Sequence, residues 1–246
     1  RYEEAYLLAK KLINGRLSEN EKKDVAHLYA MNGYMYATGF MLRGNRQLAK
    51  ARAILEEIMP YADGKVREYA LPKISLTWYF EATEHHLAKH FDRALACYQI
   101  ALEGFQRLGK TDNEVSTLQH IAEIKASLYD VAGSEEAYKQ ALALARQTGK
   151  ADVQMAVLRE LCNICRTIGD VRQAQARAAS MDSLMDGTAD LQTRFGYYNQ
   201  KGSEARGLGQ YSIAEQWFLR GKDIAEHNDA KAVSPNKHLS YSNLRN

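Results

Sequence analysis

Small side chains recur along the chain at a constant interval and predict a set of paired helices. Four segments, residues 91–94, 131–134, 171–174 and 211–214, align with one another at a period of 40 residues. Each segment ends on a small residue, at Ala94, Ser134, Ala174 and Ala214. The residues four positions further on are Tyr98, Tyr138, Ala178 and Phe218, which is the spacing of one face of a helix.

A second set of small residues lies twelve positions before the first, at Ala82, Ala122, Cys162 and Gly202. Four positions before each of these stands a large residue, at Trp78, Leu118, Leu158 and Tyr198. Paired helices approach closely only where their facing side chains are small and a large neighbour fills the adjacent space. The pattern therefore predicts two helices in every unit.

The pattern is less regular toward the two ends of the chain. An earlier unit fits through Met35, Gly39, Leu48, Ala51, Leu55 and Ile58, with Pro60 and Pro72 bracketing an irregular joint after it. Residues 2–12 have the pattern of a second helix without its first, and Ser234-Pro235 has that of a helix start. We expect a single all-α domain over residues 1–246, with partial units at 1–15 and 234–246 and full units near 24–63, 73–112, 113–152, 153–188 and 193–230.

Through these anchors the chain resembles the tetratricopeptide repeat family over essentially its whole length. It departs from the family in its period of 40 rather than about 34 residues, and in lacking the proline that often closes each unit. The resemblance implies a right-handed superhelical solenoid of antiparallel helix pairs, whose first helices line a concave binding groove. Turns such as residues 108–112 are also similar to those of sensory repeat arrays in bacterial signalling proteins.

The resemblance also implies which residues face the groove. Counted from the anchors they are Tyr36, Phe40, Arg43, Tyr79, Thr83, His86, Gln119, Glu123, Arg159, Asn163, Arg166, Asn199, Ser203 and Arg206. Four arginines and one acid predict an extended partner that carries carboxylates; the alternative is an ordinary solvated stripe of charge.

Some members of the family bind the terminal carboxylate of chaperones through basic residues and asparagines on three units. Arg159 and Asn163 resemble the first pair of that motif, but Gln200, Asn236 and Ser240 depart from the rest. We therefore do not expect binding of chaperone tails.

Charge and composition narrow the classes of partner. The 246 residues carry 33 basic and 30 acidic side chains, which argues against a general nucleic-acid surface or an anionic-membrane surface. No stretch approaches the roughly 18 apolar residues that span a bilayer.

Three cysteines favour a reducing, cytoplasmic compartment, whereas the signalling resemblance would place the chain on the periplasmic side of a membrane-anchored parent. Arg1 at the start indicates a fragment of a longer protein.

Residues 104–111 match the phosphate-loop pattern G-x-x-x-x-G-K-[ST]. That site requires a strand before the loop, whereas a helical pattern from Arg93 to Leu108 leads into this one. The segment 147–152 is the corresponding turn one period later. We interpret both segments as turns between units, which leaves a nucleotide-binding enzyme as a remote alternative.

Two clusters of residues suggest metal or redox chemistry. Cys162 and Cys165 fall on the packed face of a helix, where a buried thiol acts as a small apolar residue. His86 and His90, beside His85, are four residues apart and would share one helix face, but the sequence offers no further ligands at suitable spacing. We expect no catalytic residue, metal or cofactor.

The sequence thus predicts a non-catalytic scaffold that binds a protein or peptide, as the interaction part of a larger signalling or regulatory protein. The alternative is an adaptor that pairs with a second copy of itself. We expect this segment to contact neither nucleic acid nor a membrane.

Overall fold

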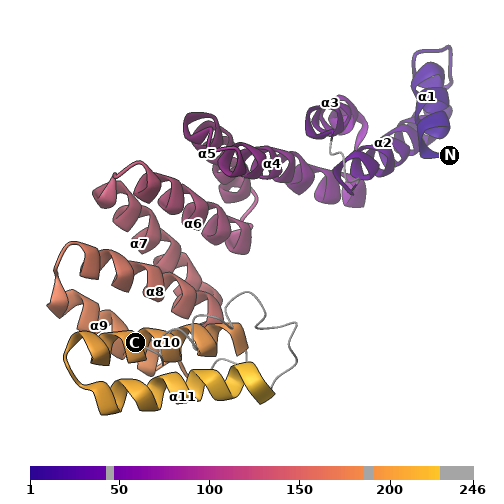
Figure 1. Ribbon diagram of the computed structural model, residues 1–246. Helices are drawn as coiled ribbons and strands as arrows, with labels where there is room; N and C mark the ends of the chain where they lie inside the picture. The colour runs from indigo at the N-terminus through magenta and orange to yellow at the C-terminus, as the bar shows by residue number, and fades with distance from the viewer. Residues whose placement is uncertain (43–46, 186–190, 228–246) are drawn as a thin grey trace. The chain divides into compact units, whose positions relative to one another are not determined.

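The computed structural model describes residues 1–42, 47–185 and 191–227, and the regular elements in these ranges are all helical, as predicted. None of the described helices combines the length and the apolar character needed to cross a bilayer. In chain order they are α1 (Tyr2–Ile13), α2 (Glu19–Leu42), α3 (Leu48–Ile58), α4 (Gly64–Leu87), α5 (Phe91–Arg107), α6 (Thr111–Ser127), α7 (Val131–Thr148), α8 (Ala151–Thr167), α9 (Val171–Asp182), α10 (Leu191–Gly207) and α11 (Tyr211–His227) (Figure 1).

The helix boundaries repeat with the period seen in the sequence. Helices α4, α6, α8 and α10 end at residues 87, 127, 167 and 207, and the helices after them begin at 91, 131, 171 and 211. Between each end and start one residue has a positive φ, namely Lys89, Tyr129, Gly169 and Gly209. The same short left-handed turn therefore joins the two helices of four successive pairs.

Replacing Tyr129 with Gly is expected to raise the free energy of unfolding by about 0.5–1 kcal/mol. A left-handed conformation costs a residue other than glycine roughly 1–2 kcal/mol, part of which the added flexibility of glycine in the unfolded chain offsets. Tyr129 has a φ of 62° and its side chain is 92% exposed, so little packing is lost. Urea unfolding measures the change, and Tyr129→Ala is the control. An equal gain in the alanine variant would show that the ring, and not the backbone, is responsible.

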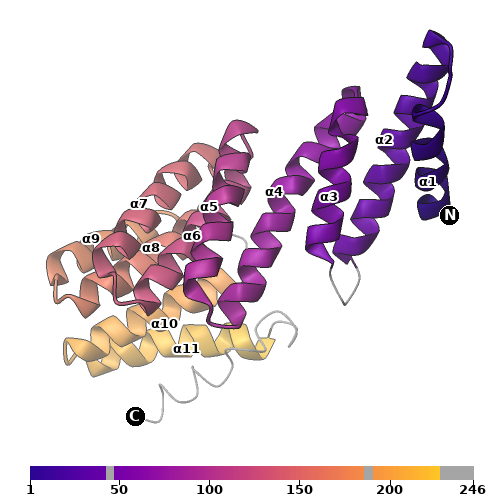
Figure 2. The same ribbon diagram turned by 90° about the horizontal axis from the view of Figure 1, so that it is seen from above.

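The contacts divide the chain into two compact units, residues 1–124 and 125–246, which are described separately. In the first unit α1 packs on α2, α2 on α3, α3 on α4 and α4 on α5. In the second, α8 packs on α7, α9 and α10, and α10 packs on α11, with which it lies side by side in Figure 2. That one domain spans residues 1–246 stays a prediction.

The small residues of the repeat lie where helices touch. All eight positions that the sequence singled out are buried, namely Ala82, Ala94, Ala122, Ser134, Cys162, Ala174, Gly202 and Ala214. Their large neighbours Tyr98, Tyr138 and Phe218 are buried as well. The prediction that these positions pack between helices is confirmed.

The anchors assigned to the first helix of the earliest full unit were wrong. Met35 is 37% exposed and a side chain at Gly39 would meet open space. The buried small residues of α2 are instead Gly33 and Ala37, and a Cβ added to Gly33 would lie 2.5 Å from Ile58 of α3. Several small residues in α2 fit the helical spacing of the repeat, and only the packing against α3 shows which of them lie at the contact.

The prediction that Pro72 lies in an irregular joint was also wrong. Pro60 is in a short 3₁₀ turn, Met59–Tyr61, but α4 begins at Gly64 and Pro72 lies inside it. A proline within a helix costs about 3 kcal/mol. The turns before it bury Val66 and Ala70 in the core of the first unit, which offsets that cost.

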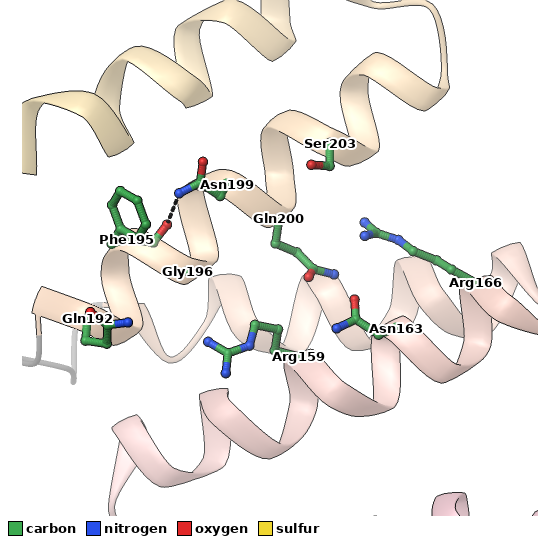
Figure 3. Close-up of a pocket in the computed structure, with 9 residues that line it drawn as sticks. All are labelled: Arg159, Asn163, Arg166, Gln192, Phe195, Gly196, Asn199, Gln200 and Ser203. Atoms are coloured by element: carbon green, nitrogen blue, oxygen red, sulfur yellow. Dashed lines mark hydrogen bonds between the residues drawn. The ribbon is translucent and has the colours of Figure 1, made fainter. Parts of the chain in front are cut away.

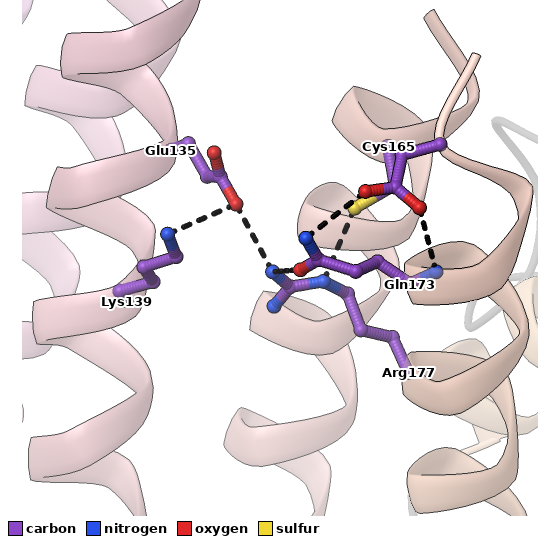
Figure 4. Close-up of polar contacts among 6 residues, drawn as sticks. Glu135, Lys139, Cys165, Gln173 and Arg177 are labelled. Carbon is purple, nitrogen blue, oxygen red and sulfur yellow. Dashed lines mark hydrogen bonds and ion pairs between the residues drawn. The ribbon is translucent and has the colours of Figure 1, made fainter. Parts of the chain in front are cut away.

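In the second unit a nearly buried arginine links α7 to α9 (Figure 4). The side chain of Arg177 is 14% exposed, and its Nη2 lies 3.1 Å from Oε1 of Glu135. Its Nε donates to Sγ of Cys165 at 3.2 Å, while Lys139 also pairs with Glu135 at 3.1 Å. Cys165 and Cys162 are both fully buried, as the sequence predicted.

Candidate functional site

A cavity of about 260 Å³ lies between α8 and α10 of the second unit (Figure 3). Pockets that enclose small-molecule ligands occupy roughly 300–1,000 Å³, so this one is better suited to a side chain or a short stretch of backbone. Five of the residues predicted to face the groove line it, together with four others. The lining residues are Arg159, Asn163, Arg166, Gln192, Phe195, Gly196, Asn199, Gln200 and Ser203.

Helical spacing brings these residues to one face. In α8 the residues Leu158, Leu161 and Cys162 are buried, which leaves positions 159, 163 and 166 on an adjoining stripe. In α10 the lining positions 192, 196, 199 and 203 follow one another at intervals of three or four. In Figure 3 the two rows of side chains face each other across the cavity.

The positive charge of the cavity is partly compensated. Nε of Arg159 lies 3.1 Å from Oε1 of Glu160, and Nδ2 of Asn163 donates to Oε2 of the same carboxylate. Nη2 of Arg166 lies 3.8 Å from Oε2 of Glu204. Neither carboxylate belongs to the lining, but both reduce the basic character that counting arginines in the sequence suggested.

Two buried polar atoms at this cavity make no hydrogen bond. They are Nη2 of Arg166, a donor, and Oε1 of Gln192, an acceptor. Figure 3 shows the two side chains at opposite ends of the cavity. A buried polar group without a hydrogen-bond partner costs about 1–3 kcal/mol, so a ligand that pairs with both atoms gains that energy.

Gly196 allows one arginine to reach over α10. A Cβ added there would lie 2.6 Å from Nη1 of Arg159. Any larger residue would displace the guanidinium from its present position. Sequence reasoning did not predict this glycine, nor Gln192 and Phe195, as lining residues; their signal is the helical spacing they share with Asn199.

Two of the predicted groove residues of α2 lie in different surroundings. Phe40 is only 5% exposed, its ring centroid is 4.8 Å from that of Tyr36, and Nζ of Lys50 lies 4.4 Å from it. Tyr36 donates a hydrogen bond to Glu3 of α1 at 2.6 Å. Phe40 therefore lies in the core of the first unit rather than on an open surface.

The misplaced anchors explain this difference. In α4, Thr83 donates to the carbonyl of Tyr79 at 2.9 Å, and in α2 Thr38 makes the same contact with the carbonyl of Tyr34 at 2.8 Å. The buried Ala37 of α2 corresponds to Ala82 of α4, so Tyr34 and Thr38 are the counterparts of Tyr79 and Thr83, two residues before the positions counted from the sequence.

Three further residues, Arg206, Gln119 and Arg43, were predicted to face the groove. Arg206 does not line the cavity, and its Cζ lies 5.9 Å from the ring centroid of Phe218. Gln119 is half-buried on α6. Arg43 lies outside the described residues.

In the first unit the predicted residues Tyr79, His86 and Glu123 surround a histidine that sequence reasoning missed. Nε2 of His120 lies 2.9 Å from the Tyr79 hydroxyl, and its Nδ1 lies 2.9 Å from Oε2 of Glu123. The His120 and His86 ring centroids are 6.1 Å apart. His120 is adjacent to Gln119 in sequence, so it reaches this cluster from the neighbouring stripe of α6.

Two tyrosines next to His120 are held in their neutral form. The Tyr98 ring stacks on the imidazole at 5.4 Å, and its hydroxyl lies 3.0 Å from that of Thr83. Burial raises the pKa of Tyr98 to about 12. Burial, with the nearby Glu123 carboxylate, also raises the pKa of Tyr79. Both hydroxyls therefore remain protonated at neutral pH.

The phosphate-loop pattern is a helix end followed by a turn. Residues 104–107 are the last four of α5, Gly109 has a φ of 60°, and α6 begins at Thr111. A Cβ added to Gly104 would lie 3.1 Å from the Cβ of Ser75, so this glycine allows α5 to approach α4. The prediction that a helix runs into this motif is confirmed.

The structure separates His86 from His90. Helix α4 ends at Leu87 and Lys89 has a positive φ, so His90 does not continue the helix face on which His86 lies. The prediction that these two histidines share a helix face was wrong, because a left-handed turn falls between them.

No protein-family model matches the chain, and no curated protein sequence is detectably similar to it. Among solved structures it is similar to BtubC (BKLC) from P. vanneervenii, with a TM-score of 0.56 and 16% identity over 91% of this chain and 87% of that one. It is also similar to aspartyl phosphate phosphatase F from Bacillus subtilis, with a TM-score of 0.52 and 11% identity over 96% of this chain and 61% of that one. At these identities the likeness shows the fold alone.

Proposed function

We propose that this chain, whose all-α fold is a tetratricopeptide-like array of helix pairs, is a non-catalytic scaffold that holds a protein or extended peptide against α8 and α10. The observation that carries the proposal is the cavity between these helices, where a donor on Arg166 and an acceptor on Gln192 make no hydrogen bond.

An extended peptide carries the hydrogen-bond acceptors and donors that Arg166 and Gln192 lack as partners in this cavity. Its backbone alternates carbonyl acceptors with N–H donors, so one segment can accept from Arg166 and donate to Gln192. Asn163 and Gln200 carry amides that can both donate and accept. A cavity of about 260 Å³ leaves room for a side chain of the same peptide.

The two arginines favour a partner that carries carboxylates. Arg166 is 3.8 Å from Glu204, which is longer than a hydrogen bond, so a carboxylate of the partner can approach the guanidinium more closely. Hydrogen bonds between ionised groups are roughly twice as strong as neutral ones. We therefore propose an acidic segment as the ligand. The resemblance of the turns to sensory repeat arrays supports a place within a larger signalling protein.

Replacing Arg166 with Ala should weaken peptide binding about tenfold or more, because a hydrogen bond to a charged group contributes about 1.5–3 kcal/mol. The probe is a library of short labelled peptides, one half rich in Asp and Glu and the other with Lys and Arg in their place. Fluorescence anisotropy measures the affinity of each peptide for the intact chain. We expect the acidic half to contain the ligands.

Two further variants control for effects on the fold. The added Cβ of Gly196→Ala would displace the guanidinium of Arg159, which is the flexible end of that side chain, so the variant should bind more weakly. Alanine is also more favourable than glycine within a helix, so the free energy of unfolding should not fall. Arg172→Ala removes an exposed arginine of α9 and should change neither quantity. The proposal fails if no peptide of the library binds, or if the Arg166 and Gly196 variants bind as tightly as the Arg172 variant.

A further inference from the structure

Three potential metal ligands converge in the first unit from helices that belong to different pairs. His86 lies in the last turn of α4, and His120 and Glu123 lie on α6. One ring nitrogen of each histidine and one carboxylate oxygen lie within 4.8 Å of one another. We propose that His86, His120 and Glu123 bind a zinc ion.

The ligand set and its spacing suit zinc. Zinc is bound by imidazole nitrogens and carboxylate oxygens at about 2.0–2.2 Å, which places neighbouring ligand atoms of a tetrahedral site about 3.3 Å apart. Nδ1 of His120 and Oε2 of Glu123 are 2.9 Å apart, close to that spacing. His86 completes the set by a rotation of its half-buried side chain, which lies one residue before the end of α4.

The surroundings of His120 determine which nitrogen binds the ion. Without metal, the Glu123 carboxylate can only accept, so the contact of 2.9 Å places the imidazole proton on Nδ1. Zinc bound between Nδ1 and Glu123 would take the place of that proton. The neutral ring would then carry its proton on Nε2, which lies 2.9 Å from the Tyr79 hydroxyl and can donate to it. A metal-bound histidine ordinarily donates its other N–H to an acceptor in this way. Stacking against Tyr98 fixes the plane of the ring.

A second group of three potential ligands, Glu81, His85 and Cys97, is less suited to zinc. Glu81 already pairs with Arg52 at 2.8 Å. Burial, together with the Glu81 carboxylate, raises the pKa of Cys97, whereas zinc requires the thiolate. The charge of Arg52 would also oppose a cation at this position.

The proposed ion would have an open coordination position. Glu123 is exposed and the two histidines are half-buried, so water has access to the fourth position. The site belongs to the first unit, whereas the peptide cavity belongs to the second. Each proposal can therefore fail without the other.

Equilibrium dialysis against zinc alone tests the site, using the full chain without an affinity tag after treatment with a chelator. We expect a single zinc ion per chain and a higher unfolding temperature in its presence. Changing His86 or His120 to Gln, or Glu123 to Gln, should each reduce the affinity more than about 100-fold. Tyr79→Phe should reduce it roughly 10- to 100-fold, the effect expected of a residue that orients a ligand.

His90→Gln and His85→Gln are the matched controls and should leave zinc binding unchanged. Circular dichroism confirms that each variant is folded, and Glu123→Gln alters an exposed position where folding is not at risk. Zinc binding that survives the changes at His86, His120 and Glu123 would overturn the proposal. So would a loss of binding that follows His85→Gln, because the ion would then lie in the second group.

Discussion

Replacing Arg52 with Met is expected to lower the free energy of unfolding by about 3 kcal/mol. The Arg52 side chain is only 11% exposed, and its Cζ lies 3.4 Å from the ring centroid of Trp78, while Nη2 donates to Glu81 at 2.8 Å. A desolvated cation–π contact contributes about 2 kcal/mol and a hydrogen bond to a charged group about 1.5–3 kcal/mol, and the two are not fully additive. Urea unfolding of the full chain measures the loss.

Arg67→Met in α4 is the matched control, because Arg67 is exposed and belongs to the same unit. It should change the free energy of unfolding by less than about 0.5 kcal/mol. Hydrogen exchange should locate the effect of Arg52→Met in α3 and α4, the helices that the arginine joins. Equal effects of the two substitutions would mean that the contacts with Trp78 and Glu81 do not stabilise the unit.

Changing Gly202 to Ala should lower the free energy of unfolding by about 1–3 kcal/mol, although alanine ordinarily stabilises a helix. A Cβ added there would lie 2.5 Å from Cδ1 and 2.7 Å from Cζ of Phe218. Phe218 is buried, so its ring cannot move aside without disturbing the contact between α10 and α11. Loss of amide protection in these two helices would identify the site of the effect.

The same substitution at Gly207 provides the control. Gly207 is the last residue of α10, and a Cβ there would meet nothing within 4 Å. Gly207→Ala should therefore leave the free energy of unfolding unchanged or raise it by up to about 1 kcal/mol. If Gly202→Ala also raised it, the small-residue positions would not be essential for the approach of paired helices.

The periodic part of the fold could be predicted because its signal lies in local spacing. Helix starts at residues 91, 131, 171 and 211 follow directly from the recurring small residues. Where the pattern was ambiguous the predictions were wrong. Met35 and Gly39 have helical spacing equal to that of the true contact residues of α2, and Pro72 is tolerated within α4 because of the apolar residues before it.

For the candidate sites, helical spacing predicted which face of each helix lines the site, but not which residues of other helices contact that face. Five of the lining residues of the cavity between α8 and α10 were on the expected stripe. Gly196 was not predicted, because its importance depends on the position of Arg159 on another helix. Phe40 has the same spacing as an exposed groove residue, but it is buried in the core of the first unit, with Lys50 of α3 over its ring.

By itself, the sequence determined that this protein consists of helices, the 40-residue period of their boundaries, and the small residues through which they pack. These features follow from the preferences of single residues and from spacing within one helix. Only the tertiary structure decided that His86 lies near His120, that Arg52 stacks on Trp78, and that a donor and an acceptor without hydrogen bonds share one cavity. Such contacts join residues on different helices, so they depend on how the helices pack, which spacing within one helix does not specify.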